Sequence, residues 1–538
     1  MASKYVYDPV DSEHGFCRVL ELYLGEFDDD LVIELKDVAL EAEDSPRYEA
    51  LSYTWGTEPA TKKVYIKPPG LDALCINQQD IQERGEQVQL MPLIYGYCDH
   101  LWVWLGIERD DSSFILEQLR SVSTLEDQER RQVIDGWFGP VYAGRHHRAF
   151  KALLGRPWFE RTWVQQEIYL AEDATVVCGK ETVEWKAFDV TSTAVLDGYI
   201  WDPEDAETSW WNSRYDLLYY LRKGPRVIGL RKLLEGTMKT LCSDPRDKVF
   251  SVLGMLDQTE SRILDALKPD YSIDVAALYK RACVTVLTNQ SSLGGLGHLI
   301  MLRDCNRIAE ATDIPTWVVD WSKPPIEINT IVWQYADAWC STGEPAVHAE
   351  SDVLPTRGVI CDVISHVQCF EQLHHESAAS VLQSIDSHFL NADGKSTRDA
   401  SLSATVLCIT QGQVSEHEGD IGSRFSISAL RESFNAIISR SRDPDESRSP
   451  NTYGPDEWLT ACLVVNLEHR GLSKTASGRM GLTSFHTEVG DVVALLLGLE
   501  AVTVLRPQTG GTYKVVGIAF VHGLNWGEGL LGPLPDTK

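Results

Sequence analysis

The chain has 538 residues, of which 43% are hydrophobic and 24% charged, the balance of a soluble globular protein with two or three domains. It carries 49 Lys and Arg against 79 Asp and Glu, so its formal net charge is −30. A surface this acidic repels phosphate backbones and anionic lipid, which argues against a nucleic-acid-binding or membrane-surface protein. No apolar run reaches the ~20 residues that span a bilayer, and Met1–Tyr5 lacks the apolar core of a signal peptide.

The 12 cysteines are scattered from Cys17 to Cys462 without a CxxC pair. In a chain this long, such spacing is typical of reduced, buried thiols, so we expect a cytoplasmic protein without a structural metal. Gly394-Lys395-Ser396 resembles the end of a phosphate-binding loop, but Phe389 stands where the first glycine of that loop belongs. The sequence therefore predicts no cofactor.

The first region reads as alternating strands and helices. Short apolar stretches predict strands at Phe16–Leu22, Tyr48–Tyr53, Val64–Ile66, Leu71–Ile76 and Leu101–Gly106, the last of them buried on both faces. Between the last two strands, Asp80 and Glu83 have the spacing of a capping box that starts a helix, which Pro92 is expected to kink. Strand, helix and strand in this order predict an α/β domain with a mostly parallel sheet and flanking helices.

Two further regions follow. Residues 188–325 show helical patterns at Tyr215–Leu221, Val249–Leu256 and Ala276–Leu287, and Asp244 is placed to cap the second of these. Residues 326–538 predict a mixed α+β region with an exposed, charged linker near 440–457. Its predicted strands are Val492–Leu497, Val502–Leu505 and Tyr513–Val521, the last two joined through a turn at Gly510-Gly511.

Three ordered blocks contain unusual combinations of residues: Tyr48–Gly56, Leu71–Gln78 and Arg156–Ile168. Together they resemble the signature blocks of the fungal heterokaryon incompatibility (HET) domain, which we place at residues 16–187. Asp244–Phe250, Pro315–Trp321 and the stretch from Gly490 to Gly523 also resemble such proteins, so the likeness extends over most of the chain.

The resemblance implies a fungal protein of nonself recognition that triggers programmed cell death. HET domains are similar to TIR domains, which have a flavodoxin-like sheet, and some TIR domains cleave NAD⁺ with a catalytic glutamate. By this analogy NAD⁺ is a candidate substrate. The implied partners are a second copy of the chain or another incompatibility protein, with no nucleic acid and no membrane. A shared fold does not establish a shared reaction, so whether the chain is an enzyme stays open.

One feature departs from the family pattern. Family members carry a helix and the start of a strand before the block at Leu71, but here Lys67-Pro68-Pro69-Gly70 leads straight into it. A parallel crossover needs a dozen or more residues. Either the edge of the sheet rearranges into a hairpin, or the domain lacks a part between Gly70 and Leu71 through a skipped exon or a wrong splice junction.

Glu167 is the candidate catalytic residue. On a helix it projects between Trp163 and Leu170 on an apolar, aromatic face, where desolvation raises the pKa of a carboxyl group. Such a group can accept a hydrogen bond from a ribose hydroxyl or stabilise the cation that forms during glycosidic cleavage. The alternative is a structural ion pair with Arg156, Arg161 or a nearby lysine that holds the helix in place, and both interpretations stay open.

The candidate substrate-binding residues follow from the rule that ligands bind beyond the carboxyl ends of parallel strands. They are Ser52, Tyr53, Trp55, Asp72, Asn77 and Gln78. Structural alternatives stand beside three of them, because Asn77 can cap the following helix, Trp55 can pack at a turn and Asp72 can face an arginine. Arg84 reads as a solvated helix residue and Cys75 as a buried core thiol.

Three hypotheses remain. The chain is a TIR-like NAD⁺-cleaving enzyme, a non-catalytic signalling module that self-associates, or an inactive copy of the family. The composition does not separate them.

Overall fold

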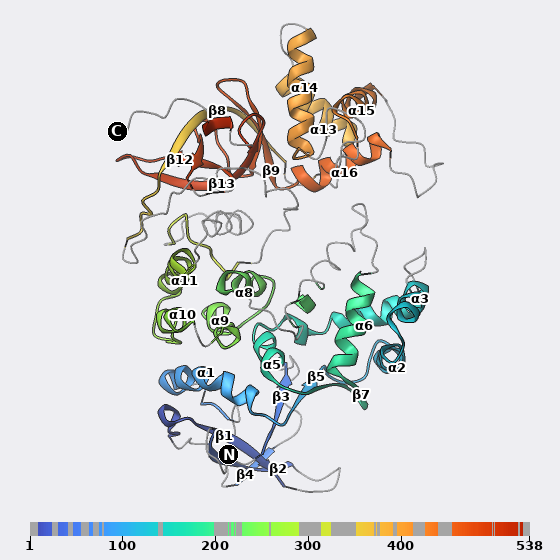
Figure 1. Cartoon of the computed structure of the whole chain (residues 1–538), viewed down its shortest axis with the longest axis vertical. Helices are drawn as coiled ribbons and strands as arrows, with labels where there is room; N and C mark the ends of the chain where they lie inside the picture. Colours follow the sequence, from blue (N-terminus) through green and yellow to red (C-terminus); the bar gives the residue numbers. More distant parts are fainter. Residues whose placement is uncertain are drawn as a thin grey trace, which may run out of the picture. The chain divides into compact units, whose positions relative to one another are not determined.

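The computed structural model describes residues 9–23, 31–40, 47–54, 64–67, 75–77, 80–137, 144–197, 214, 217–219, 221, 229–257, 260–289, 314–323, 351–370, 373, 377–390, 395–412, 425–439, 454–497, 499, 501–525 and 528–530. The chain divides into two compact units, Met1–Leu278 and Tyr279–Lys538. Figure 1 shows the elements of both units. No helix among these residues is long and apolar enough to cross a membrane.

The N-terminal unit opens with a three-stranded sheet in the order β1-β2-β4. The 3-10 helix η1 (Ser12–His14) leads into β1 (Phe16–Leu22), which pairs antiparallel with β2 (Leu31–Ala39), and β2 pairs in parallel with β4 (Val64–Lys67). The prediction of an edge strand at Phe16–Leu22 is confirmed. The sequence pattern misses β2, because Glu34, Lys36 and Asp37 interrupt its apolar residues.

A second sheet has the strand order β3-β5-β6-β7. Its first three strands are parallel, and β7 returns from β6 as a hairpin. The bounds are β3 (Glu49–Tyr53), β5 (His100–Trp104), β6 (Ala174–Cys178) and β7 (Glu181–Glu184). This arrangement confirms a mostly parallel sheet with flanking helices, although β4 lies in the other sheet.

Helices cover one face of the second sheet. They are α2 (Ser112–Ser123), α4 (Arg145–Leu154) and α6 (Trp185–Asp197), which share a buried apolar cluster with β5 and β6. On β5, buried Leu101 and Val103 alternate with half-exposed His100, Trp102 and Trp104. The expectation that this strand is buried on both faces is therefore wrong, because the cluster covers only the face that carries Leu101 and Val103.

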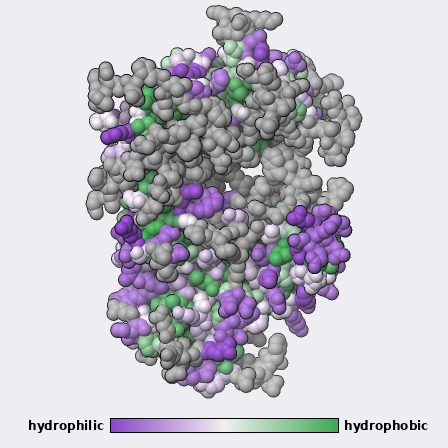
Figure 2. Space-filling model, in the orientation of Figure 1, coloured by the Kyte–Doolittle hydropathy of each residue, from purple (hydrophilic) through white to green (hydrophobic). Residues whose placement is uncertain are grey.

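Helix α3 (Asp127–Trp137) completes the helical layer beside the sheet. It buries Ile134 and Trp137 and exposes charged residues, as an amphipathic surface helix does. In Figure 2, hydrophilic residues gather over the position that α2 and α3 occupy in Figure 1. The outer surface of this layer is therefore polar.

Helix α1 (Ile81–Gly96) begins where the capping pattern predicts. Asp80 Oδ1 accepts hydrogen bonds from the backbone N–H groups of Gln82 at 3.0 Å and Glu83 at 3.1 Å, and the helix continues through Pro92. Before it, Cys75 to Asn77 form a turn. The predicted strand Leu71–Ile76 is thus wrong at its carboxyl end, while residues 71–74 lie outside the described residues.

A helical region completes the first unit, and its elements after residue 188 confirm the prediction of a helical middle. Its elements are η2 (Pro157–Glu160), α5 (Val164–Leu170), α8 (Leu230–Thr237), α9 (Asp247–Phe250), η3 (Leu253–Met255), α10 (Ser261–Ala266) and the start of α11 (Val275–Asn289). Gly254 lets η3 approach α1 and α5. A Cβ at this position would lie 2.6 Å from Pro92 Cγ and 2.9 Å from Gln166 Cδ, so a larger residue would force the elements apart.

The described part of the C-terminal unit contains a closed barrel in the order β10-β13-β12-β11-β8-β9, with every pair antiparallel. Its strands are β8 (Gly358–Phe370), β9 (Arg470–Thr475), β10 (Met480–Ser484), β11 (Val492–Leu496), β12 (Val502–Pro507) and β13 (Tyr513–Val521), and η8 (Glu528–Leu530) follows. The three strands predicted near the C-terminus are confirmed, but the closure of the barrel was not predicted.

Between β8 and β9 the chain inserts a helical layer. It consists of α13 (Ala378–Ile385), the π-helical turn η7 (Asp386–Leu390), α14 (Lys395–Ile409), α15 (Ile427–Ser439) and α16 (Pro455–Leu467). These helices share an apolar core with the barrel residues Phe370, Leu472 and Leu482. The linker predicted near 440–457 ends earlier than expected, because Pro455 opens α16, and residues 440–453 lie outside the described residues.

Candidate functional site

A chain of polar contacts joins the second sheet to helix α5. The indole Nε1 of Trp158 donates to Ser52 Oγ at 2.7 Å, and the Ser52 hydroxyl in turn donates to Glu167 Oε2. Since an indole N–H can only donate, this arrangement commits the serine proton to the carboxylate. All three residues are buried, with Glu167 only 2% exposed. Two candidate residues, 115 positions apart, are thus brought into direct contact.

The second oxygen of Glu167 faces a cation. Arg161 Nη1 lies 3.7 Å from Glu167 Oε1, and the Arg161 side chain is 27% exposed. Burial raises the pKa of Glu167, while the charge of Arg161 and the hydrogen bond from Ser52 act in the opposite direction. Of the two arginines considered as structural partners, Arg161 pairs with Glu167. Arg156 Nη1 instead donates to the carbonyl oxygens of Leu105 and Ile107.

Local sequence explains why Glu167 points inward. Pro157 opens η2, because its fixed φ suits a first helical position, and η2 buries Trp158 and Phe159 beneath the sheet. Helix α5 then starts after Trp163, and the backbone N–H of Glu167 donates to the Trp163 carbonyl at 3.2 Å. Glu167 sits in the first turn of this helix, where the helix dipole favours a negative charge.

Ser52 and Tyr53 end β3, at the carboxyl edge of the parallel strands. Tyr53 is half-buried, and its pKa is raised by burial and responds to the charges of Arg161 and Glu167. Tyr95, on α1, has its pKa raised by burial and by the Glu167 charge. The Glu167 centre, which we define as Ser52, Trp158, Arg161 and Glu167, is thus flanked by two protonated tyrosines.

Asn77 is held by a neighbouring ion pair. Buried Glu83 pairs with Arg18 of β1 and accepts the backbone N–H of Asn77 at 2.8 Å, while Arg18 Nη1 donates to the Cys75 carbonyl at 3.3 Å. The cap of α1 is Asp80 rather than Asn77. Burial raises the pKa of the Cys75 thiol to about 11, which disfavours a thiolate nucleophile. Trp55, Asp72 and Gln78 lie outside the described residues.

Another network joins α1 to the segment before α9, where the sequence pattern predicts only a helix cap at Asp244. Asp244 accepts two hydrogen bonds from the Arg246 guanidinium and one, at 2.8 Å, from Arg84 of α1. The Arg84 guanidinium also lies 3.6 Å from the ring centroid of Tyr271, so Arg84 is not the solvated residue that the pattern predicts. The signal available in the sequence was the block Asp244–Phe250, whose first five positions hold two acids and two bases.

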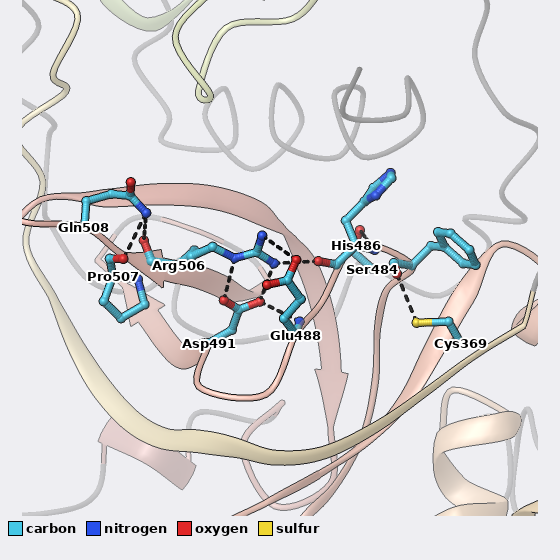
Figure 3. A network of polar contacts seen from close by, with 9 residues as sticks. Cys369, Ser484, His486, Glu488, Asp491, Arg506, Pro507 and Gln508 are labelled. Atoms are coloured by element: carbon cyan, nitrogen blue, oxygen red, sulfur yellow. Dashed lines mark hydrogen bonds and ion pairs between the residues drawn. The ribbon is translucent and has the colours of Figure 1, made fainter. Parts of the chain in front are cut away.

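A polar network in the C-terminal unit provides a contrast. Figure 3 shows Arg506 gripping Asp491, with Nε at 2.9 Å from Oδ1 and Nη2 at 3.0 Å from Oδ2. Arg506 also bonds Glu488 and the His486 carbonyl, and the Glu488 backbone N–H donates to Asp491 Oδ2. Here both carboxylate oxygens have close charged donors, which marks a structural bridge between β12 and the turn before β11. At Glu167 the arginine stands farther away.

The Glu167 centre contains one carboxylate, one hydroxyl, one guanidinium and one indole, and so a single potential metal-ligating carboxylate. In the described part of the chain, no group of three or more His, Cys, Asp or Glu is placed to hold a metal ion. The arrangement offers a carboxylate in an apolar setting, a hydroxyl committed to it and a nearby guanidinium. Such a carboxylate can stabilise a developing positive charge in a glycosidic cleavage.

Comparison with known proteins identifies the family. Residues 71–167 match the family described as "Heterokaryon incompatibility protein (HET)". These residues belong to a HET domain. The match ends at Glu167 itself and leaves out Ser52, which the fold supplies from β3. The match thereby confirms as HET sequence the block Leu71–Gln78 and the block Arg156–Ile168 up to Glu167.

One curated relative supports the same family. The chain is 22% identical over 366 residues to "Heterokaryon incompatibility protein 6, OR allele" of Neurospora crassa, an alignment that covers 52% of this chain and 53% of the relative. This HET-domain protein thus spans about half the length of the relative it matches. No solved structure matches the chain significantly.

Proposed function

We propose that this HET-domain protein acts in fungal nonself recognition as an effector of programmed cell death. The family match and the name of the Neurospora relative support the biological setting. The observation that carries the proposal is the Glu167 centre, in which a buried carboxylate with a raised pKa meets a serine hydroxyl at the carboxyl edge of parallel strands.

The proposed chemistry is cleavage of NAD⁺ at the nicotinamide–ribose bond. Glu167 would accept a hydrogen bond from a ribose hydroxyl and stabilise the oxocarbenium-like cation, and the charge of Arg161 favours the ionised form of the carboxyl group. The parallel order of β3, β5 and β6 with helices on one face supports a TIR-like domain as the scaffold. Perturbed carboxylates concentrate at functional sites, although ion pairs perturb them too.

The second candidate is a non-catalytic module that signals by self-association. The observation that favours it is the enclosure of Glu167, since a carboxylate that is 2% exposed and holds a serine has little surface for a substrate. In this case the Glu167 centre fixes α5 against the sheet. The third candidate is a copy whose short link at Lys67–Leu71 has abolished its activity.

The test is release of nicotinamide from NAD⁺ by the purified full chain. Glu167→Gln removes the charge with little change of shape, and Glu117→Gln makes the same change at an exposed position of α2. We expect release by the wild-type chain and by Glu117→Gln, and none by Glu167→Gln. Release by all three would place the chemistry elsewhere. Release only after the missing crossover is restored would mean that this chain has lost the activity.

A further inference from the structure

The segment that leads into the helix of Glu167 is held by hydrogen bonds from residues that lie beyond the family match. This segment is Glu160–Trp163, which carries Arg161 and leads into α5. We define the clamp as residues 237–248, together with Tyr271. The contacts between the two run through both backbone and side chains.

The first set of contacts fixes the backbone on either side of Arg161. The backbone N–H of Leu241 donates to the Glu160 carbonyl at 2.5 Å, and the N–H of Thr162 donates to the Leu241 carbonyl at 3.0 Å. The hydroxyls of Thr162 and Thr240 lie 2.8 Å apart, within hydrogen-bonding distance. Arg161 is thus placed by a short parallel bridge to the clamp.

Lys248 holds the clamp itself in shape. Its ammonium group is buried and donates to the carbonyl oxygens of Thr237, at 2.6 Å, and Thr240. A buried ammonium needs such acceptors, because it has lost its water. The turn that carries Thr240 and Leu241 is therefore pinned by Lys248 at the position where it meets Glu160–Trp163.

Asp247 accepts a hydrogen bond from the last residue of the same segment. Its carboxylate, 9% exposed, accepts the hydroxyl of Tyr271 at 2.5 Å and a hydrogen bond from the indole of Trp163. Trp163 is the residue before α5, and its carbonyl accepts the backbone N–H of Glu167. A shift of Trp163 would therefore move the first turn of the helix and the carboxylate on it.

We propose that Asp247 and Lys248 are positioning residues that hold α5 so that Glu167 meets Ser52, which makes the clamp part of the functional HET unit. The biological meaning of this inference rests on the proposed role of Glu167. The proposal extends the unit beyond residues 71–167, to which the family match is confined.

The test reads the geometry of the centre without any activity. The indole N–H resonance of Trp158, assigned in the full chain with Trp158→Phe, reports the hydrogen bond to Ser52 and, through it, the position of Glu167. Asp247→Leu removes the acceptor and keeps the branched shape at Cγ, and Asp247→Asn keeps one acceptor oxygen. We expect Asp247→Leu to move the Trp158 resonance toward its position in Glu167→Gln, and Asp247→Asn to stay close to the wild type.

Two further variants keep the test decisive. Ile134→Ala, in α3, destabilises the same unit by a cavity away from the clamp and should leave the Trp158 resonance in place. If Asp247→Leu does not fold, Lys248→Met supplies the same comparison, because methionine has an unbranched side chain of similar length without the donors. A folded Asp247→Leu or Lys248→Met with a wild-type Trp158 resonance would overturn the proposal.

The outcome is separable from the proposed function. A wild-type chain that neither releases nicotinamide nor kills would refute the proposed function, while the Trp158 resonance would still decide whether the clamp positions Glu167. If the chain is active, we expect the variants that move the resonance to lose that activity, and full activity in such a variant would overturn the positioning role.

Discussion

Removal of a single hydroxyl should loosen the Glu167 centre. In Ser52→Ala, the Trp158 indole loses its acceptor and Glu167 Oε2 loses its donor, and both groups are buried. Each buried polar group left without a partner costs about 1–3 kcal/mol, and a charged group costs more. Because Glu167 keeps Arg161 at 3.7 Å, we expect a total loss of about 3 kcal/mol, in the lower half of the summed range of about 2–6 kcal/mol.

The loss should depend on pH in a defined direction. The Ser52 hydrogen bond lowers the pKa of Glu167, so its removal raises that pKa further. The wild-type hydroxyl therefore stabilises the charged form. The difference between the two proteins is largest above the folded pKa that Glu167 has in Ser52→Ala, the higher of the two, and shrinks as the pH falls and the carboxyl group becomes protonated.

Hydrogen exchange of the intact chain, read by mass spectrometry, is the assay, since it separates β3 and α5 from the C-terminal unit. A loss of about 3 kcal/mol speeds exchange in these elements roughly 100-fold at pH 7. Ser112→Ala is the matched control, because Ser112 is equally buried but accepts one backbone N–H, from Arg109, at 3.2 Å. An effect of Ser52→Ala no larger than this control, and independent of pH, would refute the reasoning.

Three more predictions follow from the same contacts. Glu167→Gln should stabilise the chain at pH 7 by on the order of 1 kcal/mol, because burial raises the pKa of Glu167 and the stabilising protonated form of the wild type is lost as the pH rises. In thermal unfolding this gain in stability should vanish near pH 4. A loss of stability at pH 7 would favour a purely structural ion pair. Asp491→Ala should lower the free energy of unfolding by about 3 kcal/mol, the lower end for a broken buried ion pair, because Arg506 is partly exposed. Faster hydrogen exchange should be confined to β11 and β12 and their turn. Unchanged hydrogen exchange there would contradict the structural bridge. Transcript reads that cross the codons of Gly70 and Leu71 should reveal a skipped exon, and reads that match the sequence as written would exclude that explanation.

The sequence predicted best what local patterns encode. Asp80 marked the start of α1, and the apolar strands Tyr513–Val521 and Val492–Leu497 were found almost to the residue, because alternation and turn glycines are visible within a few positions. The closure of the barrel was not visible, since it depends on β8 pairing with both β9 and β11 across more than a hundred residues. Such pairing leaves no local signal.

The candidate site shows the same division. Glu167 and Ser52 could be proposed separately, the first from its place on an apolar helix face and the second from its place at a strand end. Their contact could not be predicted, because it depends on how α5 packs against the sheet. The cap pattern points only to Asp244, and no local signal marks Asp247, because its partners Tyr271 and Trp163 lie 24 and 84 positions away (271 − 247 and 247 − 163).

The most direct test of the account is growth after induced expression in a fungal host, with NAD⁺ measured in the same cultures. The wild-type chain, Glu167→Gln and Glu117→Gln are compared at equal protein levels. The account predicts growth arrest with loss of NAD⁺ for the wild type and Glu117→Gln, and normal growth with normal NAD⁺ for Glu167→Gln. Growth arrest by a folded Glu167→Gln at normal NAD⁺ would contradict it and favour the self-associating signalling module.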